Sequence, residues 1–264
     1  MTLTHDNYFS SKAMNLYMST SQFKAFEKCE AAALAELRGR PSEDKQAYKE
    51  GRFFEACLSG DEHLFISQNP DMVSSRGATK GNLKANYQKV IASAEAFKRQ
   101  PIFSDILNHR SRYKPQIIVN GEIAGVPFKG CIDFLDVETL NGYDTKCMRG
   151  FDKVYSDTEK MRVNWYFAYG YNYQAAIYAE LLKQMYGASG TQHILAATKE
   201  DVPDVAAMYF SDDILDNALD IVKEFAPRYD KIKKGLIEPG RCEKCDYCKQ
   251  TKVITGFEVV SEFE

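Results

Sequence analysis

Apolar residues recur at helical spacing in five segments of the chain. In the first segment Phe23, Phe26 and Ala33 fall on one side, and Ser19 or Ser21 can cap the helix N-terminus. The segment 174–187 ends at Gly187, and glycine suits the left-handed conformation that commonly closes a helix. The segments expected to be helical are 19–38, 48–65, 83–99, 174–187 and 212–235.

The region between residues 112 and 148 instead alternates apolar and polar residues, as strands do. It contains two Asn-Gly pairs, Asn120-Gly121 and Asn141-Gly142, and such a pair fits the tight type I′ turn of a β-hairpin. The pattern therefore predicts three antiparallel strands joined by turns at these pairs. Two further strands are expected at 193–200 and 205–210.

Composition is that of a globular protein. Of the 264 residues 44% are hydrophobic, and without a repeat or a linker we expect residues 1–264 to form a single domain. The formal net charge is −3, so a surface for nucleic acid would have to be a local basic patch. No segment has the apolar length of a signal peptide or a membrane span, so we expect a cytoplasmic protein with no membrane partner.

Two acids and a lysine come together in the predicted hairpin of residues 133–146. Alternation along its second strand puts Asp144 and Lys146 on one face, with Thr145 pointing the other way. Asp133 lies in the preceding strand, so two carboxylates and an ammonium share a small volume. Hard oxygen ligands suit Mg²⁺ or Mn²⁺, and the lysine can orient an attacking water. The alternative is a surface hairpin with an ordinary ion pair.

Three further polar residues are not explained by simple core packing. Glu55 lies in the apolar run of the 48–65 helix, and a buried acid needs a cation or a basic partner. Gln174 and Tyr178 are four residues apart and so share a helix face. For that pair the alternative is a packed face whose polar tips are hydrogen-bonded.

The order of these residues along the chain resembles that in the PD-(D/E)XK nuclease superfamily. The matching pieces are G-R-F-F-E at 51–55, G-C-I-D at 130–133, D-T-K at 144–146 and Q-A-A-I-Y at 174–178. The last piece, together with M-S-T-S-Q-F-K-A-F-E-K-C near the N-terminus, resembles the RecE-like and RecB-like exonuclease branch, of the lambda-exonuclease type. The resemblance covers almost the whole chain. It implies a restriction-endonuclease-like core, with a central mixed sheet flanked by helices.

The resemblance also implies roles for the residues of the hairpin. Asp133 and Asp144 would bind the metal, and the Thr145 carbonyl would be a further ligand. Lys146 would orient the attacking water. Glu55 stands where many members of the branch carry histidine, and its hard oxygens can ligate Mg²⁺ equally well.

DNA contacts are implied on the same side. By the resemblance, Gln174 and Tyr178 would position the DNA backbone. The aromatic residues from Trp165 to Tyr173 can stack on bases of a frayed end or simply pack in the core. A local basic cluster can meet phosphates, although a solvated face is the default interpretation of such a cluster. Its members are Lys146, Arg149, Lys153, Lys160 and Arg162.

The implied activity is that of a Mg²⁺-dependent DNA exonuclease. By resemblance it would digest duplex DNA from the 5′ end, in a phage or prophage setting, for recombination by single-strand annealing. A RecT-like annealing protein would be its partner, and identical subunits would form a ring. One alternative is a DNA-binding or interaction module with a metal-cysteine centre and no hydrolysis, against which the intact acids and lysine argue. Another is an endonuclease or single-strand nuclease of the same superfamily.

Seven cysteines in a reducing compartment predict metal binding or core packing rather than disulfides. Cys242, Cys245 and Cys248 have the spacing C-x2-C-x2-C, which can bring three thiolates to one centre. Zn²⁺ and iron–sulfur clusters usually take four ligands, and a metal-free reduced tail is the alternative. The pattern resembles the iron–sulfur subgroup of RecB-like nucleases, which implies Cys29 as the fourth ligand and a tie between the two ends of the chain. Both a 4Fe-4S cluster and Zn²⁺ stay open.

Overall fold

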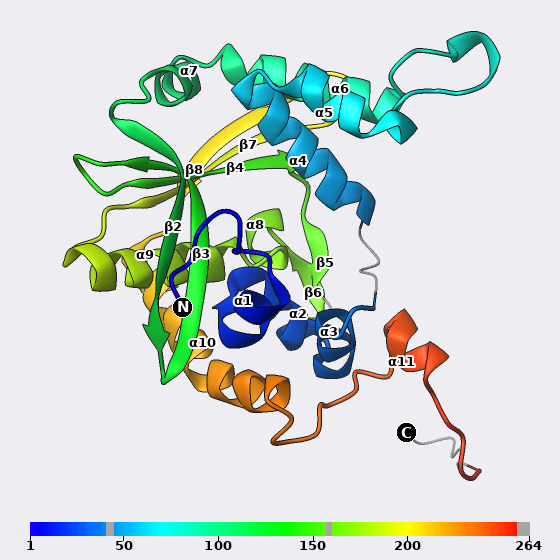
Figure 1. Cartoon of the computed structure of the whole chain (residues 1–264), viewed down its shortest axis with the longest axis vertical. Coiled ribbons are helices and arrows are strands. Elements are labelled where there is room, and N and C mark those ends of the chain that lie inside the picture. The colour runs from blue at the N-terminus through cyan, green and yellow to red at the C-terminus, as the bar shows by residue number, and fades with distance from the viewer. Residues whose placement is uncertain (41–44, 157–159, 258–264) are drawn as a thin grey trace.

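A six-stranded mixed sheet forms the centre of the computed structural model, which describes residues 1–40, 45–156 and 160–257 (Figure 1). The strands are β1 (Met18–Ser19), β2 (Tyr113–Ile123), β3 (Val126–Asp136), β4 (Gly142–Met148), β5 (Val154–Ser156), β6 (Met161–Val163), β7 (Gln192–Thr198) and β8 (Val205–Tyr209). The sheet order is β1-β3-β4-β7-β8, and β2 also pairs with β3. β1 runs parallel to β3 and β4 parallel to β7, whereas the other pairs are antiparallel. β5 and β6 form a separate hairpin.

Helices cover both faces of this sheet (Figure 1). One layer contains α4 (Lys45–Ser59), α5 (Glu62–Gln68), α6 (Ala85–Lys98) and α7 (Pro101–Asn108). The other contains α2 (Thr20–Lys28), α3 (Glu30–Leu37), α9 (Tyr171–Tyr186) and α10 (Asp212–Lys233). The shorter elements are α1 (Ser11–Leu16), α8 (Trp165–Ala168), α11 (Asp246–Gln250) and the 3₁₀ turns η1 (Pro70–Met72) and η2 (Gly77–Thr79). Within the described residues, no helix combines the length and the apolarity needed to cross a membrane.

The apolar pattern of β7 shows how the sheet separates two cores. Leu195 and Ala197 pack in the cluster that α4, α6 and α7 complete. Ile194 and Ala196 point to the opposite face, where they meet Trp165 and other residues of a second cluster. Such alternation is what a strand buried on both faces requires. The α/β class with a central mixed sheet flanked by helices is therefore confirmed.

The single helix predicted over 19–38 is wrong, because the chain breaks it at Cys29. The backbone there is extended, with φ −165° and ψ 110°, so α2 ends and α3 begins at this residue. The cap at the start of α2 is Ser19, whose hydroxyl accepts from the backbone N–H of Gln22 at 3.2 Å. The break turns the Cys29 thiol toward the C-terminal cysteines, a tertiary contact that helical periodicity does not register.

The three antiparallel strands predicted over 112–148 are present, but neither Asn-Gly pair is their turn. Asn120-Gly121 lies inside β2, where an added Cβ at Gly121 would displace the side chain of Gln184 on α9. The β2–β3 turn is Ala124-Gly125, with φ values of 50° and 76°. The β3–β4 connection turns at Leu140, with φ 57°, and β4 already begins at Gly142. Close packing of side chains therefore accounts for both glycines.

Candidate active site and metal centre

β4 lies in the middle of the sheet and carries Asp144 and Lys146 on one face. Lys146 Nζ forms an ion pair with Asp144 Oδ2, and Gln174 of α9 donates from Nε2 to Asp144 Oδ1 at 2.6 Å. The Lys146 ammonium also lies 5.1 Å from the centre of the Tyr171 ring. Burial alone would lower the pKa of Lys146, but Asp144 raises it, so the lysine stays charged. β4 and α9 thus hold an acid and a base in one fixed arrangement.

Asp133 of β3 joins this pair across the strands. Its Oδ2 accepts from the backbone N–H of Thr145 at 2.8 Å and from the Thr145 hydroxyl at 2.9 Å. Burial raises the pKa of Asp133 to about 7, and the charges of Asp144 and Glu55 act in the same direction. Mutual repulsion of this kind shows that the three acids lie close together and would gain from a cation.

Glu55 reaches the same site from α4, but it is not the buried acid that the apolar sequence around it predicts. Its neighbours Phe53, Phe54 and Cys57 are buried, whereas Glu55 itself is exposed. Loss of water around its carboxyl group raises the pKa of Glu55, and Lys146 lowers it. The helix therefore turns its apolar face into the core and presents this carboxylate to the acids of the sheet.

The acids at this site are chemically suited to a divalent cation. Glu55, Asp133 and Asp144 offer hard carboxylate oxygens, which Mg²⁺ and Mn²⁺ prefer. Asp144 Oδ2 is buried and, in the described part of the chain, has no hydrogen-bond donor besides its ion pair with Lys146. Among the described residues only four cysteines bring three or more ligand atoms within 4.8 Å of one another, so the oxygens of the three acids are spaced more widely than those sulfurs.

The structure separates the two side chains predicted to position DNA, Gln174 and Tyr178. Gln174 contacts the site directly through Asp144, as described above. Tyr178 is buried, and its hydroxyl donates to the Cys131 carbonyl of β3 at 3.2 Å. The pKa of Tyr178 is raised well above its usual range, chiefly by burial, so this hydroxyl stays protonated. A DNA contact by either side chain stays a prediction.

Three residues of the site were given no individual role by the sequence. Lys24 of α2 reaches the ring of Tyr171, and Tyr171 also contacts Lys146. Gln116 of β2 donates from Nε2 to Asp133 Oδ1 at 3.3 Å and has a left-handed φ of 53°, which is rare for a residue other than glycine. The Pro115 that precedes Gln116 is the one local hint of an irregular strand. Only the folded sheet brings these side chains to the acids.

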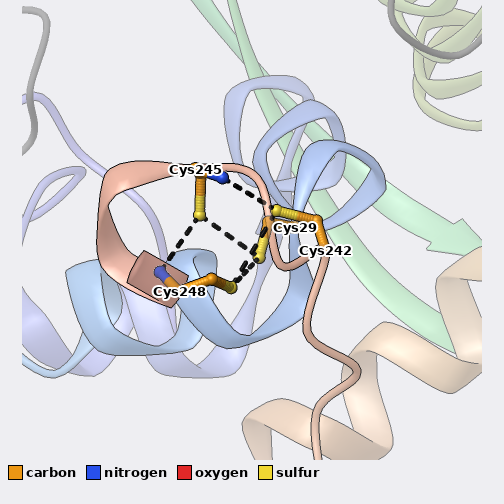
Figure 2. Close-up of side chains that lie close together, drawn as sticks. All are labelled: Cys29, Cys242, Cys245 and Cys248. Carbon is orange, nitrogen blue, oxygen red and sulfur yellow. Dashed lines mark hydrogen bonds between the residues drawn. The ribbon is translucent and has the colours of Figure 1, made fainter. Parts of the chain in front are cut away.

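The four cysteines predicted to share a metal lie together at the junction of α2, α3 and α11. Figure 2 shows Cys29 from the helix break and Cys242, Cys245 and Cys248 from the C-terminal segment, with their sulfur atoms turned inward. The Sγ atom of Cys29 lies 3.6 Å from that of Cys248 and 3.8 Å from that of Cys245. All four sulfur atoms lie within 4.8 Å of one another. The N-terminal and C-terminal parts of the chain therefore meet at this centre.

Backbone N–H groups favour the thiolate form at one of these cysteines, Cys242, whereas burial raises the pKa of Cys29 and of Cys245. The N–H of Cys245 donates to Cys242 Sγ at 3.3 Å, and the N–H of Cys248 donates to Cys245 Sγ at 3.5 Å. Burial raises the pKa of Cys242, but the N–H groups of Lys244 and Cys245 bring it down to about 6. A thiolate is the form that binds a soft metal ion.

The spacing of the sulfur atoms bears on the kind of metal. In a tetrahedral zinc site with bonds of about 2.3 Å, the sulfur atoms are about 3.8 Å apart. Three of the six separations between cysteine sulfurs are 3.6, 3.8 and 3.9 Å, close to this value, and all six are at most 4.8 Å. In a four-iron cluster each thiolate binds a different iron, so the sulfurs must lie farther apart.

Comparisons with known proteins agree with this architecture. A family model described as a PDDEXK-like domain of unknown function (DUF3799) matches residues 19–251. The crystal structure of a "putative exonuclease" from Eubacterium rectale is 29% identical, with 99% of this chain and 97% of that chain covered and a TM-score of 0.85. The structure of SSO0001 is 12% identical over 85% of this chain and 93% of that chain, and its TM-score of 0.33 is too low to carry an argument. No curated protein matches the chain.

Proposed function

The chain belongs to the PDDEXK-like family whose model matches residues 19–251, and we propose that it is a metal-dependent deoxyribonuclease that shortens duplex DNA from an end. The observation that carries this proposal is that Asp133, Asp144 and Lys146 of two neighbouring strands lie close enough to Glu55 of α4 for their charges to act on one another. The similar Eubacterium rectale protein is described as a "putative exonuclease", which supports the end-dependent form.

Each residue of the proposed site has a distinct task. Asp133, Asp144 and Glu55, with the Thr145 carbonyl, would hold Mg²⁺ or Mn²⁺. The bound metal would polarise the phosphate and lower the pKa of water. Lys146 would orient the attacking water, and its ion pair with Asp144 keeps its ammonium in place before DNA arrives.

Exposed cations beside the site offer a path for the DNA backbone. They lie on and around the β5–β6 hairpin, which packs through Val154 on the cluster that contains Trp165. Contacts between such side chains and phosphates supply affinity without reading sequence. The cations are Arg149, Lys153, Lys160 and Arg162.

The cysteine centre would have a structural task. Its sulfur spacing supports a single Zn²⁺ rather than a 4Fe-4S cluster. By holding Cys29 against the C-terminal segment, the ion would fix the end of α2 and the start of α3. A 5′ to 3′ direction, a ring of identical subunits, a RecT-like annealing partner and a role in recombination complete the proposal, and they rest on the family resemblance.

Linear and closed-circular duplexes of the same sequence test the requirement for an end. We expect Mg²⁺-dependent digestion of the linear form and an intact circle, because an exonuclease must begin at a terminus. Agarose gels of both substrates over a time course measure this directly. Nicking or loss of the circle would instead place the protein among the endonucleases of the superfamily.

Glu55→Gln tests whether the helix acid belongs to the metal site. We expect the Mg²⁺ concentration for half-maximal cleavage to rise by roughly tenfold, since one charged ligand is lost. Glu95→Gln on α6 is the matched control, because Glu95 is exposed and contacts no residue of the site. An unchanged Mg²⁺ dependence in Glu55→Gln would remove Glu55 from the ligand set.

A further inference from the structure

Lys24 of α2 places a second ammonium group in the proposed active site. Its Nζ lies 5.3 Å from the centre of the Tyr171 ring, and Lys146 Nζ lies 5.1 Å from the same ring. Lys24 Nζ also donates to the Tyr169 carbonyl at 3.0 Å. Two cations on one aromatic ring are an arrangement that attracts an anion.

The fold is built to receive this side chain. Gly170, between the two tyrosines, has a left-handed φ of 61°, and a Cβ added there would lie 2.6 Å from Lys24 Cδ. The neighbouring Phe23 is fully buried and packs against Tyr173 of α9, which holds this part of α2 against α9. The missing side chain at position 170 therefore leaves the path that Lys24 follows to the site.

The ammonium of Lys24 forms no ion pair at salt-bridge distance within the described residues, and its hydrogen bond goes to a neutral carbonyl. Burial lowers the pKa of Lys24 to about 8, and the nearby Lys146 ammonium acts in the same direction, whereas the charges of Asp144 and Glu27 oppose the shift in part. A half-buried ammonium beside a like charge is costly, and a bound phosphate would offset that cost.

An exposed aromatic ring completes the surroundings of Lys24. The Tyr169 side chain is 43% exposed, and its ring centre lies 6.0 Å from that of Tyr171. A tyrosine beside a lysine presents a surface for a base next to a charge for its phosphate, and such stacking accepts any base.

We propose that Lys24 and Tyr169 form a nucleotide subsite next to the hydrolytic centre. Lys24 holds the phosphate that neighbours the one being cleaved, and Tyr169 stacks on the base of that nucleotide. The subsite rests on the proposed nuclease function and deepens that function, because Lys24 and Tyr169 would fix the DNA strand on the α2 side of the acids. Its ligand is therefore a DNA strand whose terminal bases are unpaired.

Binding of DNA without cleavage tests the subsite. Ca²⁺ replaces Mg²⁺, and a duplex with a frayed end is titrated with wild type, Lys24→Gln, Lys24→Arg and Tyr169→Ala over a range of salt concentrations. We expect Lys24→Gln to weaken binding about tenfold and to reduce the slope of log K against log[salt] by about 0.7 to 0.9, the loss of one phosphate contact. Lys24→Arg should restore the slope. Tyr169→Ala should weaken binding roughly tenfold without changing the slope.

Lys28→Gln is the matched control, because Lys28 is exposed on the same helix, α2. Cleavage rates in Mg²⁺ then separate the outcomes. A raised KM with kcat changed less than about threefold supports the subsite. If wild type cuts DNA while Lys24→Gln binds like Lys28→Gln, or if Lys24→Gln lowers kcat alone, the subsite is wrong and the nuclease proposal stands. If wild type neither binds nor cuts DNA, the nuclease proposal fails and the subsite with it.

Discussion

Asp144→Asn is expected to lower the rate of Mg²⁺-dependent DNA cleavage by at least about a thousandfold. The substitution keeps the shape of the side chain but removes the charge that would bind the metal and that pairs with Lys146. Lys146→Ala should have an effect of similar size, because the attacking water loses its orienting group. Rates of nucleotide release from a linear duplex measure both changes.

The fold should survive Asp144→Asn. The charge of Asp144 helps to raise the pKa of Asp133, so its removal relieves repulsion between the acids, and this gain offsets the loss of the ion pair with Lys146. Thermal unfolding and DNA binding in Ca²⁺ should therefore stay close to wild type. Asp216→Asn, at an exposed position of α10, is the matched control and should cleave normally. Substantial cleavage by Asp144→Asn or Lys146→Ala would rule out this site as the hydrolytic centre.

Cys29→Ala is expected to release the metal and to lower the free energy of unfolding by about 3 kcal/mol or more. The reason is that Cys29 is the one ligand from the N-terminal part of the chain, so its loss opens the cage and separates the two ends. Metal content per chain and chemical denaturation measure the two effects. Zn²⁺ should be present at one ion per chain in a colourless wild-type protein.

The matched control for this substitution is Cys57→Ala. Cys57 lies on α4 and is also buried, but it packs in a core cluster that does not contain the four cysteines of the centre. The Cys57→Ala protein should lose some packing energy and keep the metal. A brown anaerobic wild-type preparation would contradict zinc in favour of an iron–sulfur cluster. Unchanged metal content in Cys29→Ala would show that the fourth ligand lies elsewhere.

The superfamily and the fold could be predicted from sequence because their signals are local. Asp144 and Lys146 are two residues apart in a strand, and the three C-terminal cysteines are three residues apart, so spacing alone brings them together. Cys29 was reached through the family resemblance, and the structure places it with the other three. The predicted PD-(D/E)XK superfamily is confirmed by the family match.

The errors arose where tertiary packing overrides a local rule. Gly121 looked like part of a turn, yet it is a glycine because α9 packs against it. The helix break at Cys29 follows from the cysteine centre, which lies far away in sequence. Apolar neighbours predicted that Glu55 is buried, but its side chain points out of the core toward the acids.

The unpredicted part of the site consists of contacts between distant segments. Lys24 and Tyr169 are separated by 145 positions, and nothing in the helical pattern around Lys24 distinguishes it from the exposed Lys28. Gln116 meets Asp133 only because β2 and β3 pair in register. Such residues can be found once the sheet is assembled, because burial and charge then single them out.

The most direct test of the account is incubation of the wild-type protein with a linear duplex labelled at either 5′ end, with Mg²⁺ or with a chelator. Mg²⁺ should release the 5′ label early as small products, the strand should then shorten from that end, and the chelator should stop both. A protein that shifts the duplex on a native gel in Mg²⁺ but never shortens it would contradict the account and identify a DNA-binding module without hydrolysis.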